Sequence, residues 1–158
     1  MKYRIGFGFD VHRLEKGKPL FLGGVKIDSQ YGAVGHSDAD VLIHAICDAL
    51  LGAAALGDIG THFPNTSPEF KNIDSKILLG RVTALLNEAH YSIGNIDATI
   101  ILESPKIMPY AAAMKKTLAG LMHISEGCVS IKATTNEQMG YVGRGEGISA
   151  HAVALITE

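Results

Sequence analysis

The sequence contains no tryptophan, only two cysteines and few charged residues, which make up 19% of its 158 positions. Cys47 and Cys128 are too few for a disulfide scaffold, so both are expected to be reduced. Stretches without a charged residue fall well short of the ~18 residues that a membrane-spanning helix needs. Charged residues near the N-terminus also interrupt any apolar stretch of the signal-peptide kind. We therefore expect a cytoplasmic protein without a membrane partner.

The few charges are nearly balanced in sign. The chain has 14 Lys and Arg against 16 Asp and Glu, a formal net charge of −2, which argues against a broad nucleic-acid-binding surface. An apolar fraction of 47% excludes intrinsic disorder, and the length suits a single domain over residues 1–158. Two residue types are enriched: 18 glycines, about 11% against the usual ~7%, and seven histidines.

Hydrophobic periodicity predicts the order of strands and helices. Strands are expected over residues 3–10, 21–27, 93–102, 129–135 and 148–157, and helices over residues 38–55, 74–90 and 109–123. Ser37, followed by acidic residues, has the form of a helix N-cap. Gly23 and Gly24 are expected to bend the second strand. Residues 58–72 form a loop of ~15 residues, a length typical of binding loops.

This order is typical of an α/β (α+β) protein. We expect a single domain with one mixed β-sheet covered on one face by helices. The opposite face of the sheet would then be left uncovered by helices, and we expect it to be buried by association with further subunits.

Two acid–histidine patterns suggest a metal site. Asp10 and His12 lie two residues apart on one face of a strand and can converge on one point, or they simply close the strand as a charged pair. Asp40, His44 and Asp48 recur at four-residue spacing along a largely apolar helix. They are either a solvent-facing row of ion pairs or a buried stripe in which His44 binds a metal and a carboxylate holds its other ring nitrogen. Ligation by Asp10, His12 and His44 would leave an open position, as in catalytic zinc sites.

The second candidate region follows the strand at 129–135. Hydroxyls, an amide and successive glycines at a strand end can donate hydrogen bonds to phosphate oxygens, and Glu137 could complete the shell of a hard cation such as Mg²⁺. Arg144 is a candidate phosphate clamp. The alternative is a flexible hairpin, residues 140–147, with a surface Arg–Glu pair. Lys106 could likewise meet a phosphate or remain solvated.

Together these segments resemble the 2-C-methyl-D-erythritol 2,4-cyclodiphosphate synthase family of the non-mevalonate isoprenoid pathway. They occur in the family's order and spacing over nearly the whole chain. The matching segments are Gly8-Phe9-Asp10-Val11-His12, His36-Ser37-Asp38 with Asp40 and His44, residues 50–60, Phe63-Pro64, Lys132-Ala133-Thr134-Thr135 and Gly143-Arg144-Gly145-Glu146-Gly147.

The resemblance implies an activity, its cofactors and an assembly. The substrate would be 4-diphosphocytidyl-2-C-methyl-D-erythritol 2-phosphate, and the products the 2,4-cyclodiphosphate and CMP. Asp10, His12 and His44 would bind one divalent metal per subunit, usually zinc, and a second cation (Mg or Mn) would lie at Glu137 with the substrate diphosphate. The family forms a homotrimer with active sites between subunits, so the sheets would pack together.

The resemblance also assigns site residues. His36 and Thr135 would stabilise the transition state. Substrate contacts would be made by Asp10, Val11, His12, His36 and Ser37, by Asp58, Ile59, Gly60, Phe63, Pro64, Asn65, Thr66 and Ser67, by the cytidine-binding segment Leu102, Glu103, Ser104, Pro105, Lys106, Ile107 and Met108, and by Thr134, Thr135, Asn136, Glu137, Tyr141 and Arg144. An isoprenoid-like ligand on the trimer axis would meet Phe9, Arg144 and Glu146.

The chain departs from the common family pattern at a few positions, none of them a metal ligand. Asn65 and Ser67 replace two aspartates, so Asn65 keeps an acceptor for a substrate hydroxyl but loses the charge. Asn136 replaces a threonine, and Tyr141 replaces a phenylalanine.

Two other functions fit parts of the pattern. His36, Asp38, Asp40 and His44 also suit a His-Asp type metal phosphohydrolase, although such domains are all-helical and the strand signals speak against one. A non-catalytic module that binds metal and nucleotide is the remaining alternative.

Overall fold

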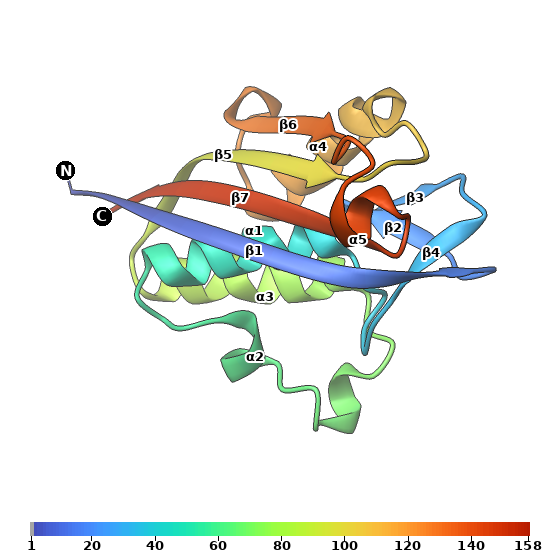
Figure 1. The fold of residues 1–158 in the computed structure, drawn as a ribbon. Coiled ribbons are helices and arrows are strands. Elements are labelled where there is room, and N and C mark those ends of the chain that lie inside the picture. Colours follow the sequence, from blue (N-terminus) through green and yellow to red (C-terminus); the bar gives the residue numbers. More distant parts are fainter. Residues whose placement is uncertain (1) are drawn as a thin grey trace.

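Five strands form one mixed sheet, in the spatial order β4-β1-β7-β5-β6 (Figure 1). The computed structural model describes residues 2–158. The pair β5–β6 is parallel, and every other neighbouring pair is antiparallel. The strands are β1 (Tyr3–Lys16), β4 (Tyr31–Val34), β5 (Ser92–Ile101), β6 (Val129–Thr134) and β7 (Gly147–Thr157).

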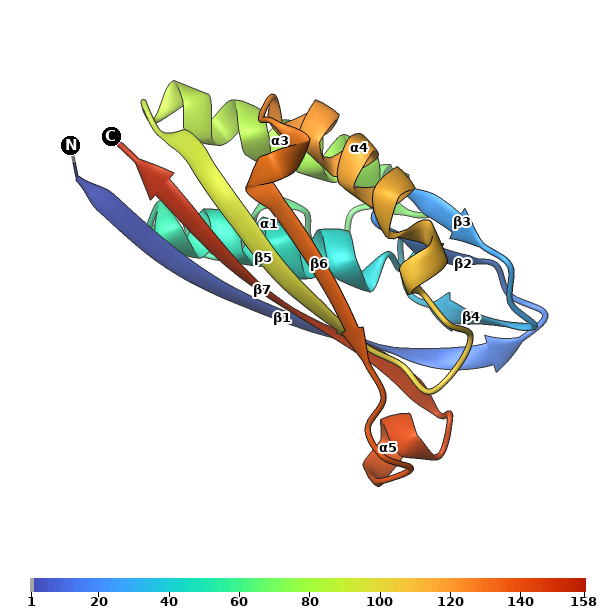
Figure 2. The same cartoon turned by 90° about the horizontal axis from the view of Figure 1, so that it is seen from above.

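The helices are α1 (Val41–Ala53), α2 (Ile59–His62), α3 (Ser75–Glu88), α4 (Ala111–Met122) and α5 (Gly140–Gly143), with 3₁₀ turns at Pro68–Phe70, Met108–Tyr110 and Glu126–Cys128. Of these, α1, α3 and α4 cover one side of the sheet (Figure 2). Helix α1 contacts β1 and β7 on one side and α3 on another. Since it is enclosed in this way, ten of its residues are buried. The expected α+β class, with one mixed sheet covered on one face by helices, is confirmed, whereas α5 projects beyond the sheet (Figure 2).

The structure corrects the sequence prediction in the region between β1 and α1. Strand β1 runs six residues past the expected end at Asp10, and β4 was not predicted. Residues 21–27 are not one bent strand but a hairpin, β2 (Leu20–Leu22) and β3 (Val25–Ile27). Its two-residue turn is possible because Gly23 and Gly24 both adopt positive φ, 58° and 74°.

Helix α1 begins at Val41, capped by Asp40 and not by Ser37. The Asp40 carboxylate accepts hydrogen bonds from Ile43 N at 3.0 Å and from Gly23 N and Gly24 N of the hairpin turn at 2.9 and 2.7 Å. Burial raises the pKa of this fully buried carboxyl, although the backbone donors oppose the shift. The helix therefore begins after Asp40, because backbone donors of the helix and of the hairpin turn together satisfy the buried Asp40 carboxylate.

Strand β1 packs directly on the backbone of α1, because the two residues that face the helix here have no side chain. A Cβ atom built on Gly6 would lie 1.8 Å from Ala49 O, and one built on Gly8 would lie 1.9 Å from Ala45 O. The helix presents alanines to the strand, at four-residue spacing. This close approach sets the distance between α1 and the sheet.

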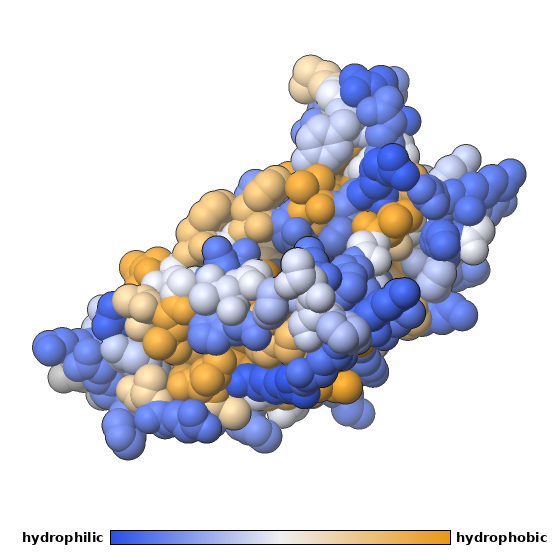
Figure 3. Space-filling model, turned by 90° about the horizontal axis from the view of Figure 1, so that it is seen from below, coloured by the Kyte–Doolittle hydropathy of each residue, from blue (hydrophilic) through white to orange (hydrophobic). Residues whose placement is uncertain are grey.

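The opposite face of the sheet carries no helix and exposes large apolar side chains. In β1, Tyr3, Ile5 and Phe7 are 64, 73 and 62% exposed, and Phe9 and Val11 are each 43% exposed. Val153 of the neighbouring β7 is also 43% exposed. In the view from below, the edge of the molecule that runs from the N-terminal end, at the left, to the projecting α5, at the top, is largely orange, that is, hydrophobic (Figure 3). An apolar surface of this kind is typical of a subunit interface. Within residues 2–158, no helix is long and apolar enough to cross a membrane.

Substituting Gly8→Ala should destabilise the fold strongly. The new methyl group would overlap the Ala45 carbonyl oxygen, so the strand and helix must separate, at a cost of about 3 kcal/mol or more. Urea unfolding measures the loss. The matched control is Gly52→Ala in α1, where a Cβ meets nothing within 4 Å and the higher helix propensity of alanine should add about 0.5–1 kcal/mol. An unchanged unfolding midpoint for Gly8→Ala would refute the close approach.

Candidate functional site

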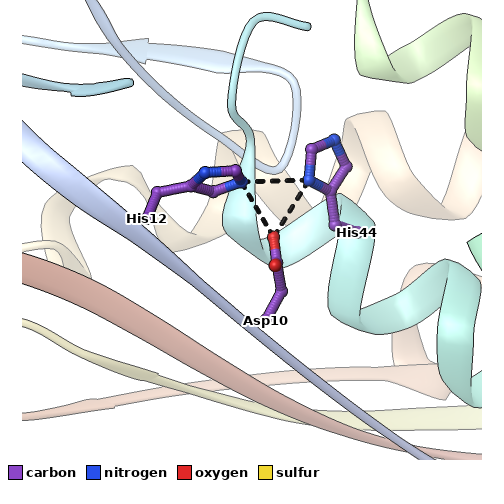
Figure 4. Close-up of side chains that lie close together, drawn as sticks. All are labelled: Asp10, His12 and His44. Atoms are coloured by element: carbon purple, nitrogen blue, oxygen red, sulfur yellow. Dashed lines mark hydrogen bonds and ion pairs between the residues drawn. The ribbon is translucent and has the colours of Figure 1, made fainter. Parts of the chain in front are cut away.

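Asp10, His12 and His44 converge on one point, as expected from their spacing (Figure 4). Asp10 and His12 lie on the helix-facing side of β1, and His44 extends toward them from α1. Asp10 Oδ2 lies 2.9 Å from His12 Nε2 and 2.9 Å from His44 Nδ1, and the two histidine nitrogens are 3.2 Å apart. The three side chains are 12 to 24% exposed. Two imidazoles and a carboxylate are thus held together at a partly open position.

This donor set fits a zinc ion. Zinc binds histidine nitrogen and carboxylate oxygen at 2.0–2.2 Å with tetrahedral geometry, which places neighbouring ligand atoms about 3.3 Å apart. The separations of 2.9, 2.9 and 3.2 Å are slightly smaller, so a small outward movement of the side chains suffices. Three protein ligands would leave a further position open on such an ion, as in catalytic zinc sites.

The backbone of β4 orients His12 for this role. His12 Nδ1 lies 3.1 Å from the carbonyl oxygen of Val34. A carbonyl oxygen only accepts, so Nδ1 must carry the proton. In the neutral ring, Nε2 then presents its lone pair to the cluster.

The partners of His44 differ from those expected. The sequence left two alternatives for a stripe of Asp40, His44 and Asp48, namely a solvent-facing row of ion pairs or a buried stripe with a carboxylate on the second ring nitrogen of His44. Instead, Nε2 lies 2.9 Å from Ser75 Oγ and 3.2 Å from Ser37 Oγ. Asp40 caps the helix, and Asp48 accepts a hydrogen bond from Ile59 N at 2.7 Å, which anchors the start of the loop at 58–72.

Without a metal, the cluster favours an ion pair between the Asp10 carboxylate and a protonated His44 ring. Burial alone would raise the pKa of Asp10, but hydrogen bonds and charges from His12 and His44 lower it to about 2. Burial likewise lowers the pKa of His44, but the hydrogen bond and charge of Asp10 more than offset this and raise it. The site therefore strongly stabilises a negative charge on Asp10, which is the form that binds a cation.

A pocket of about 170 Å³ opens beside the cluster. Its wall includes His36, Ser37, Ile59, Gly60, Phe63 and Asn65, which the resemblance assigned to substrate contacts. Phe70, Ile73 and Leu78 also line it and were not predicted; in the sequence they appear only as ordinary apolar residues of the loop and of α3. His36 Nε2 also lies 3.4 Å from the carbonyl oxygen of Ser67.

A second pocket, of about 250 Å³, lies at the ends of β5 and β6. Residues of the predicted cytidine segment line it together with the end of β6; they are Leu102, Glu103, Pro105, Lys106, Ile107, Met108, Pro109, Ala133, Thr134 and Thr135. Glu103 also supports the following turn, because its Oε1 accepts hydrogen bonds from Asn136 N at 2.9 Å and Gln138 N at 3.2 Å.

The two pockets share no lining residue. Register places Val11, Ser149, Ile101 and Thr134 in one row across β1, β7, β5 and β6, so Val11 and Thr134 are three strand spacings, about 14 Å, apart. The side chains of Asp10 and His12 face the helices, whereas Thr134 lies on the exposed side of its strand. A single chain therefore keeps His36 and Thr135 in separate pockets.

The YgbB family model matches residues 3–157, nearly the whole chain. The chain belongs to the YgbB family. A relative from Parabacteroides distasonis, a 2-C-methyl-D-erythritol 2,4-cyclodiphosphate synthase, is 61% identical over 156 residues, which are 99% of this chain and 97% of the relative. The synthase of the same name from Porphyromonas gingivalis strain W83 is 59% identical over 154 residues, covering 98% and 95%.

Solved structures share this YgbB-family fold. A 2C-methyl-D-erythritol-2,4-cyclodiphosphate synthase in its CDP-bound form superposes with a TM-score of 0.90 at 36% identity, covering 98% of this chain and all of that chain. The bifunctional IspDF of Campylobacter jejuni gives a TM-score of 0.94 at 39% identity, but this chain spans only 42% of it.

The remaining residues expected at a YgbB-family site lie outside both pockets. Val11 and Tyr141 line a third pocket, of about 480 Å³, with the end of β1. Asp58 caps α2 by accepting from Thr61 N. Arg144 forms two hydrogen bonds with Glu146, at 2.9 and 3.0 Å, which is the surface pair that the sequence left open as an alternative. The other residues that line none of these three pockets are Pro64, Thr66, Ser67, Ser104, Asn136 and Glu137.

Acidification should remove the stability that Asp10 supplies to the metal-free protein. Its folded-state pKa is about 2, below the ordinary value of 3.8, so the contribution is fully present above pH 4 and is lost as the pH falls toward 2. We expect the stability difference between metal-free wild type and Asp10→Asn to shrink by about 1 kcal/mol from pH 6 to pH 3. Urea unfolding with a chelator measures it. A difference that does not change with pH would contradict the stabilisation of this carboxylate.

Proposed function

We propose that this chain converts 4-diphosphocytidyl-2-C-methyl-D-erythritol 2-phosphate to 2-C-methyl-D-erythritol 2,4-cyclodiphosphate and CMP. The observation that carries the proposal is the convergence of Asp10, His12 and His44 beside a pocket, in a chain 61% identical to a synthase of that name. The same assignment makes the protein a cytoplasmic enzyme of isoprenoid biosynthesis that acts on a small nucleotide substrate.

The reaction is an intramolecular phosphoryl transfer. An oxygen of the 2-phosphate attacks the β-phosphorus, and a new P–O–P bridge closes the ring. The bond from the β-phosphorus to the oxygen bridging it to the α-phosphorus breaks, and its electron pair leaves with CMP. Ring closure with expulsion of CMP makes the enzyme a phosphorus–oxygen lyase. The attacking phosphate is already anionic, so the protein mainly has to position the two ends and stabilise charge.

The pocket beside the metal cluster would hold the erythritol phosphate. A zinc ion bound by Asp10, His12 and His44 would supply positive charge next to the attacked phosphoryl group. His36 and Ser37 would donate hydrogen bonds to phosphate oxygens as these gain charge. The loop at 58–72 would exclude water, and its start is fixed by the Asp48–Ile59 hydrogen bond.

The pocket at the ends of β5 and β6 would hold the cytidine, and Thr134 to Glu137 would contact the diphosphate. Thr135 would stabilise the transition state. Glu137 would bind a second cation, Mg²⁺ or Mn²⁺, together with diphosphate oxygens, since one carboxylate alone is an incomplete ligand set.

The assembly proposed is a homotrimer in which neighbouring chains join these two half-sites. The exposed apolar face, including Ile5 at 73% and Phe7 at 62%, supplies a surface for association. The separation of His36 from Thr135 within one chain supports the same arrangement. In a three-fold ring, the metal half of each chain would meet the cytidine half of the next.

The alternatives are less well supported. The five-stranded sheet is incompatible with an all-helical His-Asp phosphohydrolase domain. A non-catalytic module that binds metal and nucleotide would keep the same pockets, and only a measurement of turnover separates it from an enzyme.

The substrate and an analogue that lacks the 2-phosphate should behave differently. With an internal nucleophile at an effective concentration of ~10⁵ M or more, the substrate should give almost only cyclic product and CMP. The analogue should bind yet release CMP at a negligible rate. ³¹P NMR and CMP chromatography measure both reactions. Rapid CMP release from the analogue would mean that water is the nucleophile, and no turnover of the substrate would favour the non-catalytic module.

Mixing two inactive variants should restore activity if sites form between chains. His44→Ala loses a metal ligand and Glu137→Ala loses the cation ligand, so either variant alone should be inactive. In randomly mixed trimers refolded at equal ratio, about one quarter of the sites combine an intact metal half with an intact cytidine half. The expected CMP release is therefore about a quarter of the wild-type rate per site. Absence of any recovery, with trimers verified by light scattering, would place both halves on one chain.

A further inference from the structure

His44 is connected to a carboxylate through one serine hydroxyl. Its Nε2 lies 2.9 Å from Ser75 Oγ, and the hydroxyl of Ser75 donates in turn to Asp38 Oδ1. Ser75 is the first residue of α3 and is fully buried. Asp38 is held in place because Ser75 N donates to its Oδ2 at 3.0 Å and Asp40 N donates to its Oδ1 at 3.2 Å.

The direction of each hydrogen bond in this chain follows from which groups can donate. A carboxylate only accepts, so the single hydroxyl proton of Ser75 belongs to the bond with Asp38. Toward His44, Ser75 Oγ then has only lone pairs and must accept. Nε2 of His44 therefore carries a proton. Without a cation, Nδ1 also donates, to the Asp10 carboxylate 2.9 Å away. A cation that takes the place of the Nδ1 proton leaves a neutral ring with its proton on Nε2 and its Nδ1 lone pair toward the cation.

We propose that Asp38 and Ser75 are positioning residues that keep His44 in the Nε2–H tautomer, with Nδ1 ready to bind the metal. They do for His44 what the Val34 carbonyl oxygen does for His12. This inference rests on the metal site of the proposed function and adds two residues that touch neither metal nor substrate.

Ser37 provides the comparison within the same site. Its Oγ also lies 3.2 Å from His44 Nε2 but accepts a hydrogen bond from Ala39 N, and it is not bonded to a carboxylate. Its hydroxyl proton is not committed to an acceptor-only group, so Ser37 can either donate to Nε2 or accept from it. Ser37 alone therefore cannot select the tautomer.

The same contacts tie the pocket loop to the metal cluster. Asn72 N donates to the carbonyl oxygen of His36 at 2.7 Å, and Asp38 N donates to that of Ile73 at 3.1 Å. With the Asp38–Ser75 bonds, these fix the end of the loop and the start of α3 against His44. Metal geometry and the pocket wall thus depend on the same few hydrogen bonds.

Zinc affinity, measured by competition with a chromogenic chelator on the full-length chain, tests the proposal. Ser75→Ala and Asp38→Asn should each weaken zinc binding ~10–100-fold. The double variant should be little weaker than either single variant, because the two residues act as one unit. Ser75→Thr keeps the hydroxyl and should bind zinc more tightly than Ser75→Ala. Ser37→Ala is the matched control and should have the smaller effect.

A second measurement reads the tautomer itself. In ¹⁵N-histidine NMR of metal-free Asp10→Ala protein, which lacks the carboxylate that faces Nδ1, neutral His44 should carry its proton on Nε2, and adding Ser75→Ala should populate both tautomers. A proton mainly on Nδ1 in Asp10→Ala would overturn the positioning role. Thermal unfolding in chelator identifies any variant that fails to fold, and the isosteric Asp38→Asn then remains as the test.

Each outcome has one meaning. If wild-type protein binds no zinc, the metal site of the proposed function is wrong. If it binds zinc but Ser75→Ala and Asp38→Asn bind equally well, or Ser37→Ala weakens binding just as much, the positioning role is overturned.

Discussion

The close contact between β1 and α1 is the constraint on which the rest of the structure depends. Two glycines of the strand meet the backbone of the helix, with Cβ positions within 2 Å of helix carbonyl oxygens. The next two helix-facing residues of the strand are Asp10 and His12, and the residue before Ala45 is His44. The same approach that packs the core therefore brings three ligand side chains within 3.2 Å of one another. A looser contact would separate the strand ligands from the helix ligand.

Local periodicity made the metal cluster a candidate, and the family resemblance decided between it and the alternatives. Side chains two apart on a strand share a face, and His44 belongs to a helix whose apolar pattern predicts burial. A carboxylate directly on the second ring nitrogen of His44 was one of two alternatives for the stripe. The structure instead places Ser75 there, 31 residues away in the sequence, and Asp38 behind it. No periodic pattern connects residues across a loop of that kind. Ser75 was expected only at the start of a helix.

The start of α1 was mispredicted for a related reason. Ser37, Asp38 and Asp40 are all good capping residues, so local sequence does not choose between them. The choice depends on the β2–β3 hairpin, whose turn donates two backbone hydrogen bonds to Asp40. Because Asp40 caps the helix, residues 36–38 form bends outside it, and from there Ser37 contacts His44 and Asp38 contacts Ser75. The contact between Asp40 and the hairpin thus keeps residues 36–38 out of the helix, and these residues contribute to the site.

The uncovered sheet face connects the fold to the division of the site. The sheet has helices on one side only, and its other face carries large exposed apolar side chains of β1, a surface typical of a subunit interface. Within one chain, the metal cluster faces the helices, and the pocket at the ends of β5 and β6 lies about three strand spacings away. Under the proposed function, one chain would not bring both pockets to a single phosphorus atom, whereas a neighbour would present its own β5–β6 pocket to the metal half. In the proposed assembly, the exposed apolar face and the separation of the two pockets would be completed by the same partner, a second copy of this chain.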